Sequence, residues 1–436
     1  MLIAKNGRRD DIVFRGVRVV EPTENIDAKL DVIIDAGVIT RLESPDSSRS
    51  TNAHRVIDGD GLVLAPGFVD PHVHLRTPGR EDEETIATGT AAAAAGGYCA
   101  ILAMPNTDPV VDSAAVLGSL IEAAEAEAEV PVGFLAAITR DQSGAELTEM
   151  AELADAGAAG FSDDGRPVVA PGLMRRALQY SSVTGRRLAL HCEEPTLSKD
   201  GQMHEGAVSA ELGFAGYPSV AESLMVSRDL ALAAYEGQPL HLLHLSARES
   251  VEALSRAQAA GVRATAEVTP HHLCLTDEAV RSLDSNVKMN PPLRSADDRA
   301  ALVEALRDGT IGAVATDHAP HARHEKEVPF EAAPFGVTGL ETAFSALYTH
   351  LVEPGLLPLQ TLLERMSAGP ARAYGLEPPK LAVGAPANLV LLDPRASWRV
   401  DESTFRSRSA NSWLLGRTLK GRVRATVAAG RLVHEA

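Results

Sequence analysis

Cysteine is scarce in this chain, and its placement excludes two classes of protein. The three cysteines, Cys99, Cys192 and Cys274, lie far apart and form no Cys-x-x-Cys pair. Neither a thiolate zinc cluster nor a disulfide framework is therefore indicated. This cysteine usage suits a reducing compartment, and we expect a cytoplasmic protein.

Long apolar runs are also lacking. Residues 1–7 contain no apolar core of the kind found in a signal peptide. The Ala-rich stretch 90–104 is too short to cross a bilayer and is interrupted by Gly96-Gly97. We expect no association with a membrane.

Positive charge is in deficit, with 41 Lys and Arg against 59 Asp and Glu, giving a net charge of −18. This argues against a nucleic-acid surface, because phosphate binding requires clustered Lys and Arg. An anionic substrate would be attracted by local positive groups and a metal, not by the overall field. Aromatic residues make up only 4%, yet 45% of the chain is hydrophobic, which is enough for a sizeable core.

Both ends of the chain are typical of short β-strands separated by turns. The candidate strands are residues 11–14, 17–20, 31–34 and 38–42 near the N-terminus, and 387–393 and 421–433 near the C-terminus. We therefore expect the two termini to build one small composite β-sandwich domain, residues 1–63 and 378–436.

The middle of the chain, residues 64–377, alternates apolar strand-like runs with helical patterns. The eight candidate strands are residues 62–70, 98–104, 132–137, 160–162, 188–191, 240–245, 263–268 and 311–316. Helical patterns between them cover residues 113–129, 145–156, 172–184, 220–236 and 247–260. This repeat predicts an α/β fold with a TIM-like (β/α)8 barrel as the catalytic domain. A doubly wound open sheet is the alternative.

Two histidines, His72 and His74, directly follow the first candidate strand of the barrel. Residues i and i+2 of a strand point to the same face, so both imidazoles can be directed at one metal ion. Arg76 continues this face by one more step and can meet an anion. An isolated His-x-His pair is explained equally well by two hydrogen-bonded histidines at a strand end. The residues at the ends of the other strands must therefore decide between this explanation and a metal site.

Polar residues recur where the other candidate strands end, and these ends form the active site of a barrel. The candidate metal ligands are His72, His74, Asp164, His191, His244 and Asp317. Six ligands are enough for two ions that share a bridging carboxylate. A divalent ion makes water nucleophilic at neutral pH, and Asp317 is placed to act as the proton shuttle. Spacing alone does not distinguish Asp163 from Asp164.

Several other residues have structural explanations. We expect His271 and His272 to orient the rim, His241 to be structural and Cys192 to be a packing residue. We expect three histidines that lie outside any constellation to be at the surface: His54, His350 and His434.

Long motifs in the chain resemble those of bacterial dihydroorotases, which belong to the cyclic amidohydrolases of the amidohydrolase superfamily. The motifs include Arg76-Thr77-Pro78-Gly79, Met104-Pro105-Asn106-Thr107, Ser162-Asp163-Asp164-Gly165, His244-Leu245-Ser246, Pro270-His271-His272-Leu273, Asn290-Pro291-Pro292-Leu293-Arg294, Thr316-Asp317-His318-Ala319-Pro320-His321 and Pro334-Phe335-Gly336. The resemblance covers nearly the whole chain. It implies reversible, zinc-dependent cyclisation of N-carbamoyl-L-aspartate to L-dihydroorotate in pyrimidine (UMP) biosynthesis.

The resemblance also implies roles for individual residues. It implies one or two zinc ions on the six ligands, with Asp164 as the bridge and Asp317 as the catalytic acid and base. The substrate-binding residues that it implies are His74, Arg76, Asn106, Asn290, His321, Phe335 and Gly336. Arg76, Asn106 and His321 would hold the substrate carboxylate. Asn290, Phe335 and Gly336 would close over the ring. Residues 318–336 would form a lid.

Two departures narrow the resemblance. Many relatives bridge their metals with a carboxylated lysine, but residues 161–167 contain no lysine. This favours the dihydroorotase subgroup that uses aspartate. Thr77 stands where a Glu is frequent, with no clear consequence.

Two other functions remain open. The first is another cyclic amidohydrolase, a hydantoinase or allantoinase, although Arg76 favours a ring that bears a carboxylate. The second is a non-catalytic scaffold for aspartate transcarbamoylase, although all six ligands are kept. We expect a homodimer and a complex with aspartate transcarbamoylase.

Overall fold

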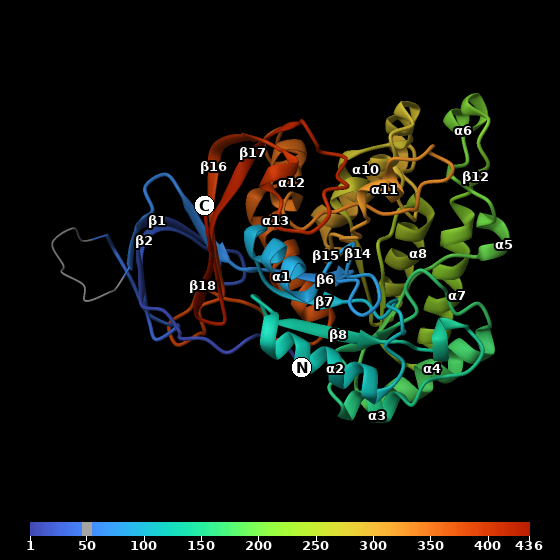
Figure 1. The fold of residues 1–436 in the computed structure, drawn as a ribbon, viewed down its shortest axis with the longest axis horizontal. Coiled ribbons are helices and arrows are strands. Elements are labelled where there is room, and N and C mark those ends of the chain that lie inside the picture. The colour runs from blue at the N-terminus through green and yellow to red at the C-terminus, as the bar shows by residue number, and fades with distance from the viewer. Residues whose placement is uncertain (46–54) are drawn as a thin grey trace.

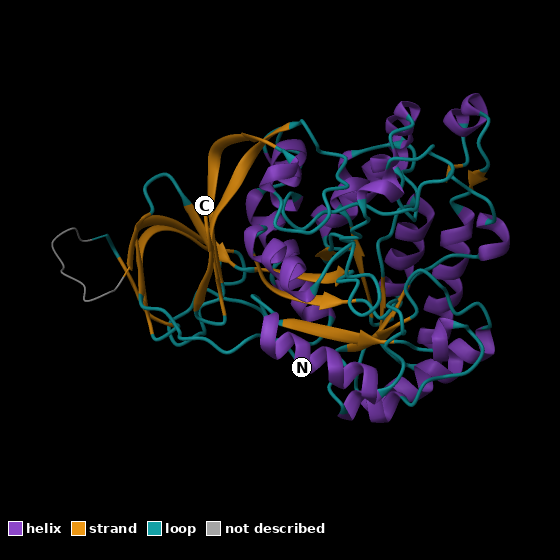
Figure 2. Cartoon of the chain, in the orientation of Figure 1, coloured by secondary structure: helices purple, strands orange, loops and turns teal. Residues whose placement is uncertain are grey.

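The structure is a computed structural model that describes residues 1–45 and 55–436. It contains two large sheets, which Figure 2 shows as separate groups of strands. A curved sheet built from the two termini lies on one side of the molecule, and a parallel barrel surrounded by helices lies on the other (Figure 1).

Eight strands form the barrel, and each pairs in parallel with the next along the chain. They are β6 (Phe68–Val73), β7 (Tyr98–Ala103), β8 (Val132–Ala136), β9 (Gly160–Ser162), β10 (Leu188–Leu190), β13 (Leu240–Leu242), β14 (Ala264–Val268) and β15 (Ala313–Val314). Val73 forms a parallel bridge with His318, and the His74 amide donates to the His318 carbonyl at 2.9 Å. These contacts join the first strand to the segment after the last strand. The barrel prediction is confirmed, and the open-sheet alternative is wrong.

Helices cover the outside of the barrel (Figure 1). The longer ones are α1 (Ile86–Ala95), α2 (Ala114–Glu127), α4 (Pro171–Thr184), α7 (Val220–Glu236), α8 (Arg248–Ala259), α10 (Ala296–Asp308) and α13 (Leu359–Met366). The predicted helix at 220–236 has the bounds of α7, which ends where Gly237 adopts a left-handed conformation with φ +64°. The helix predicted at 145–156 is shorter in the structure, where α3 spans Met150–Asp155. Two residues before α3, the Thr148 hydroxyl donates to the carbonyl of Ala137, just after β8, at 2.8 Å.

The predicted first strand, residues 62–70, is two strands that belong to different sheets. β5 (Val63–Pro66) joins the terminal sheet, and β6 begins the barrel after Gly67. A Cβ atom at Gly67 would lie 2.8 Å from the Cys99 side chain, so only glycine allows this close approach. Both strands are fully buried, and the apolar run of β5 continues across Gly67 into Phe68-Val69 of β6, which is why the apolar pattern does not reveal the break.

The terminal sheet combines strands from both ends of the chain. Its N-terminal strands are β1 (Ile12–Glu21), β2 (Ile26–Asp35), β3 (Val38–Glu43), β4 (Arg55–Asp58) and β5, and its C-terminal strands are β16 (Leu389–Arg399), β17 (Thr418–Ala428) and β18 (Arg431–Glu435). β5 connects the two groups, because it pairs in parallel with β1 and antiparallel with β16. The composite β-rich unit is therefore confirmed. The domain bounds 1–63, 378–436 and 64–377 remain a prediction, since β5 continues to Pro66.

An insertion that the sequence did not predict separates β10 from α7. It contains α5 (Pro195–Ser198), β11 (Met203–His204), α6 (Ala207–Leu212) and β12 (Gly216–Tyr217). Its tip stands away from the barrel near α6 (Figure 1). Short helices also follow two later strands: α9 (Pro270–Cys274) follows β14, and α11 (Arg323–Lys326) follows β15. Within the described part of the chain, no helix combines the length and apolar character needed to span a membrane.

Candidate active site

All six predicted metal ligands meet inside the C-terminal end of the barrel. They come from the ends of β6, β9, β10, β13 and β15, and each is at most 7% exposed: His72, His74, Asp164, His191, His244 and Asp317. Parallel strands that all point the same way bring these segments to one rim. The arrangement that the strand ends predicted is therefore present as a cluster in space.

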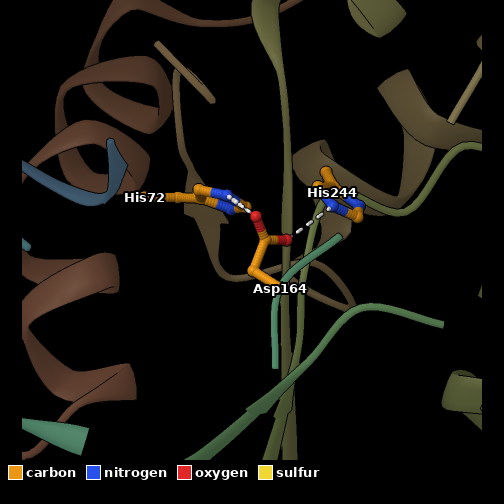
Figure 3. Close-up of side chains that lie close together, drawn as sticks. All are labelled: His72, Asp164 and His244. Atoms are coloured by element: carbon orange, nitrogen blue, oxygen red, sulfur yellow. Dashed lines mark ion pairs between the residues drawn. The ribbon is translucent and has the colours of Figure 1, made fainter. Parts of the chain in front are cut away.

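Asp164 lies at the centre of this cluster. Figure 3 shows its carboxylate between two imidazoles, with Oδ2 3.6 Å from His72 Nε2 and Oδ1 3.5 Å from His244 Nε2. Its Oδ1 also lies 3.6 Å from His191 Nδ1. Burial raises the pKa of Asp164, but the imidazoles of His72, His244 and His74 together outweigh burial and hold that pKa well below its ordinary range. The carboxylate is therefore ionised and reaches both sides of the cluster.

Asp163 points the other way and has a structural role. Its Oδ1 accepts from the backbone amides of Ile138 at 2.8 Å and Thr139 at 3.1 Å. These bonds fix the loop after β8. The structure thus separates the two neighbouring aspartates, which spacing in the sequence could not.

Asp317 completes the cluster from the opposite side. Its Oδ1 lies 3.1 Å from His74 Nε2 and 3.4 Å from His72 Nε2. Burial raises the pKa of Asp317, but the imidazoles of His72 and His74 more than offset this and lower it. Asp317 is therefore a carboxylate at neutral pH and can accept a proton.

The donor set fits a divalent cation. Two overlapping groups have ligand atoms within 4.8 Å of one another, namely His72–Asp164–His244 and His72–His74–Asp317. His72 Nε2 and Asp164 Oδ1 are buried, and neither has a hydrogen-bond partner among the described residues. Buried polar atoms without a partner are costly, and a cation between these atoms would satisfy both.

Glu267, which the sequence analysis did not identify, fixes the orientation of His72. It is fully buried on β14, with Oε1 2.7 Å from His72 Nδ1 and Oε2 2.9 Å from His241 Nε2. Burial raises the pKa of Glu267, but the bonds to these histidines lower it to about 2. The resulting carboxylate holds the Nδ1 proton of His72 and leaves Nε2 for the cluster. The only sign of this role in the sequence is a single acidic residue near the end of the apolar strand β14.

Asn106, which follows β7, contacts two members of the cluster. Its Oδ1 lies 2.8 Å from His74 Nδ1, and its Nδ2 donates to Asp164 Oδ2 at 3.4 Å. The predicted substrate contact is thus also a residue that orients His74.

Arg76 and His321 are connected by a second carboxylate that the sequence analysis missed, Glu83. Arg76 Nε lies 3.0 Å from Glu83 Oε2, and His321 Nδ1 lies 3.2 Å from Glu83 Oε1. Arg76 Nε also donates to the Pro320 carbonyl at 3.1 Å, and His321 Nε2 lies 2.8 Å from the Phe335 carbonyl. The structure places the two predicted carboxylate-binding residues side by side, with Glu83 between them.

Asn290 lies on the other side of the rim, where its Nδ2 donates to Glu193 Oε2 at 3.0 Å. Phe335 and Gly336 end the predicted lid. Gly336 adopts φ +122°, and a Cβ atom there would lie 2.7 Å from Ala319 Cβ, so a larger residue would push the lid away from the barrel.

Two buried lysines anchor this lid. Lys288 Nζ donates to the carbonyls of Phe330 at 2.8 Å and Glu331 at 3.1 Å. Lys326 Nζ donates to the carbonyls of Pro334 and Gly336, both at 2.9 Å. These hydrogen bonds attach the main chain of residues 330–336 to the two lysines.

The remaining histidines have other surroundings. His272 bonds Thr269 Oγ1 at 2.7 Å and the Pro291 carbonyl at 2.9 Å, so it ties the rim loops together. His271 is buried beside it, with an Nε2 atom that has no partner among the described residues. His350 is exposed, His434 is partly buried, and His54 lies outside the described residues.

Comparison with known proteins gives consistent results. A profile of the family described as "Dihydro-orotase-like" matches residues 61–250, and one of the "Amidohydrolase family" matches residues 232–434. A dihydroorotase of Pelotomaculum thermopropionicum is 47% identical over 97% of this chain and 98% of its own. A dihydroorotase of Geotalea daltonii is 45% identical over 98% of this chain and 99% of its own. Among solved structures, an L-hydantoinase (dihydropyrimidinase) of Arthrobacter aurescens superposes with a TM-score of 0.88 at 27% identity, covering 98% of this chain and 96% of the other.

Proposed function

Because the chain belongs to the dihydroorotases of the amidohydrolase superfamily, we propose that the buried cluster of histidines and aspartates is the active site of this activity. The reaction is the reversible cyclisation of N-carbamoyl-L-aspartate to L-dihydroorotate with release of water, a step of de novo pyrimidine synthesis. The observation that carries the proposal is the convergence of four histidines and two aspartates beside the Arg76–Glu83–His321 group.

We propose zinc as the metal, with one or two ions per subunit. Imidazole nitrogens and carboxylate oxygens are the ligands of catalytic zinc sites, and the cluster supplies four of the first and two of the second. A bound divalent ion supplies polarisation of the substrate carbonyl and a more acidic water. Asp164 would bridge two ions in place of a carboxylated lysine, because it reaches His72 on one side and His244 and His191 on the other.

The residues of the chain divide the chemistry between them. In hydrolysis, Asp317 removes a proton from the attacking water and delivers it to the leaving ring nitrogen, so that one C–N bond breaks and one C–O bond forms. In cyclisation the same steps run in reverse. Asp317 suits this role because it is a buried carboxylate in contact with His74.

The substrate is held at two ends. Arg76, Asn106 and His321 hold its carboxylate, and His74 borders it. Asn290, Phe335 and Gly336 contact the ring from the lid side. This assignment is supported by the positions of Arg76 and His321, which both contact Glu83 and therefore lie together at the rim.

One coupled experiment tests the proposal. Purified protein is analysed for metal content, and hydrolysis of dihydroorotate is compared with that of hydantoin and allantoin. We expect bound zinc and selective turnover of dihydroorotate. Faster turnover of hydantoin would favour the activity named for the Arthrobacter aurescens neighbour. Absence of both zinc and turnover would favour a scaffold.

We also propose a cytoplasmic homodimer that associates with aspartate transcarbamoylase. The support is the family resemblance together with cysteine usage that suits a reducing compartment. Light scattering of the protein with and without the transcarbamoylase, run beside the activity assay, tests both associations and their effect on turnover.

A further inference from the structure

We infer that Glu193 is a positioning residue that fixes both the ring proton of His191 and the amide orientation of Asn290. It lies two residues after His191, at the rim of the barrel. Its Oε2 is 2.8 Å from His191 Nε2 and 3.0 Å from Asn290 Nδ2, and its Oε1 accepts from the Ser198 hydroxyl. One carboxylate oxygen thus connects a predicted metal ligand with a predicted substrate contact. The inference rests on the proposed function, because it assigns the partner of Asn290 from the substrate of that reaction.

The first consequence concerns His191. A carboxylate only accepts hydrogen bonds, so His191 Nε2 must carry the hydrogen that it shares with Glu193. The lone pair of the neutral ring then lies on Nδ1. This atom faces the cluster, 3.6 Å from Asp164 Oδ1 and 3.0 Å from His244 Nε2. Glu193 therefore selects Nδ1 as the ligand atom of His191.

The second consequence concerns Asn290. The orientation of an amide is assigned from its hydrogen bonds. Because the Glu193 carboxylate can only accept, the NH2 group of Asn290 must be the part that faces Glu193. Oδ1 of Asn290 must then face away from Glu193. This oxygen is buried and has no hydrogen-bond partner among the described residues. The site thus presents an acceptor that its own residues leave unsatisfied.

The proposed substrate supplies the matching donor. Dihydroorotate carries two ring N–H groups, and N-carbamoyl-L-aspartate carries ureido N–H groups. An unsatisfied buried acceptor selects ligands that can donate to it and rejects those that cannot. If the Asn290 amide were rotated by 180°, its NH2 group would face the ring N–H of the substrate, and two donors would oppose one another. By preventing the flip, Glu193 makes Asn290 an acceptor for the ring N–H.

Two variants and a matched control test this inference in the full-length, zinc-loaded protein. Glu193→Ala removes both contacts of Oε2. Glu193→Gln keeps one carbonyl oxygen that can accept from both partners, while its NH2 faces Ser198. Ser198→Ala removes only the contact at Oε1. The readouts are KM and kcat for dihydroorotate and zinc affinity by competition with a chelator, with circular dichroism to check folding.

We expect Glu193→Ala to raise KM at least tenfold and to weaken zinc binding at least tenfold. Glu193→Gln should recover most of both losses, and Ser198→Ala should stay within twofold of the wild type. The double variant Glu193→Ala/Asn290→Ala should have the KM of Asn290→Ala alone, because Glu193 affects ring binding through Asn290.

Opposite results overturn the inference. If Glu193→Ala is folded with unchanged KM and unchanged zinc affinity, Glu193 positions neither residue. If the two substitutions raise KM additively, the connection to Asn290 is wrong. If Glu193→Ala does not fold, Glu193→Asp, whose shorter carboxylate withdraws from both partners, must show the same two losses. An inactive wild type would instead contradict the proposed function, and the zinc-affinity measurement would still test the His191 half.

Discussion

Nδ1 of His72 lies 2.7 Å from Oε1 of Glu267, and both side chains are completely buried. The second oxygen of Glu267 lies 2.9 Å from Nε2 of His241. One carboxylate between two imidazoles therefore sets which nitrogen of His72 faces the cluster of candidate metal ligands. Hydrogen-bond partners of this kind raise the basicity of a ligand and fix its ring.

Replacing Glu267 with glutamine should lower zinc affinity about 10- to 100-fold. A glutamine has one acceptor oxygen, so either His72 or His241 would face an NH2 group and lose its acceptor. Competition with a chelator at fixed pH measures the change. Glu341→Gln is the matched control, because that carboxylate accepts the backbone amides of Arg406 at 2.7 Å and Ser407 at 3.3 Å in another part of the chain. Equal zinc affinities for Glu267→Gln and the wild type would refute the role.

Asp317→Ala should lower kcat about 100- to 10,000-fold, because the variant lacks the group that we propose moves the proton between water and the ring nitrogen. Asp317 also contacts His72 and His74, so zinc content must be measured on the same sample. Single-turnover hydrolysis of dihydroorotate by zinc-containing protein isolates the chemical step. Near-normal turnover with zinc retained would rule out Asp317 as the acid and base.

Arg76→Met should remove the preference for a ring that bears a carboxylate. A hydrogen bond to a charged group contributes about 1.5–3 kcal/mol, so kcat/KM for dihydroorotate should fall about 10- to 100-fold. Turnover of 5,6-dihydrouracil, which lacks the carboxylate, should change little. Arg80→Met is the control, because Arg80 also pairs with Glu83 at 3.0 Å but is 45% exposed and pairs with Asp82 and Glu325 as well. An unchanged ratio of the two activities in Arg76→Met would show that Arg76 does not select the carboxylate.

The sequence predicted the six cluster residues because of the topology of the barrel. Parallel strands bring their C-terminal ends to one rim, so residues as distant as His72 and Asp317 could be grouped without knowing any contact. The choice between Asp163 and Asp164 depends on backbone angles in the turn around Gly165, which has φ +74°. Strand periodicity does not extend into such a turn.

The roles of the carboxylates Glu83, Glu193 and Glu267 could not be predicted from the sequence, for one common reason. A single acidic residue in a strand or loop has no periodic signal of its own. Each also has a partner that lies far away in the chain: Glu83 contacts His321, Glu193 contacts Asn290 and Glu267 contacts His72. The sequence also did not reveal the break at Gly67, because β5 and the first residues of β6, Phe68-Val69, are both apolar although the two strands enter different sheets.

The anchoring of the lid by Lys326 should depend on pH. Its ammonium bonds the carbonyls of Pro334 and Gly336. Burial, followed by the nearby charge of Lys288, lowers the pKa of Lys326 from 10.5 to about 7, against smaller opposite effects of Asp284 and Glu325. In the unfolded chain the ordinary value returns, so between about pH 7 and pH 10 the unfolded state binds a proton that the folded state has released. The free energy of unfolding contributed by this group must therefore rise with pH over that range.

Lys326→Met should remove this dependence. Urea unfolding of the wild type and the variant at pH 7, 8 and 9 should show a difference in unfolding free energy that shifts in favour of the wild type by up to about 1 kcal/mol per pH unit. Lys29→Met is the control, because Lys29 is exposed and the hydrogen bond with Asp60 raises its pKa. Lys29 is therefore protonated in both the folded and the unfolded state from pH 7 to 9, and it adds no pH dependence over that range. A constant difference between wild type and Lys326→Met from pH 7 to 9 would mean that Lys326 is not forced toward its neutral form in the folded protein. The lid would then be held by an ordinary, permanently charged ammonium.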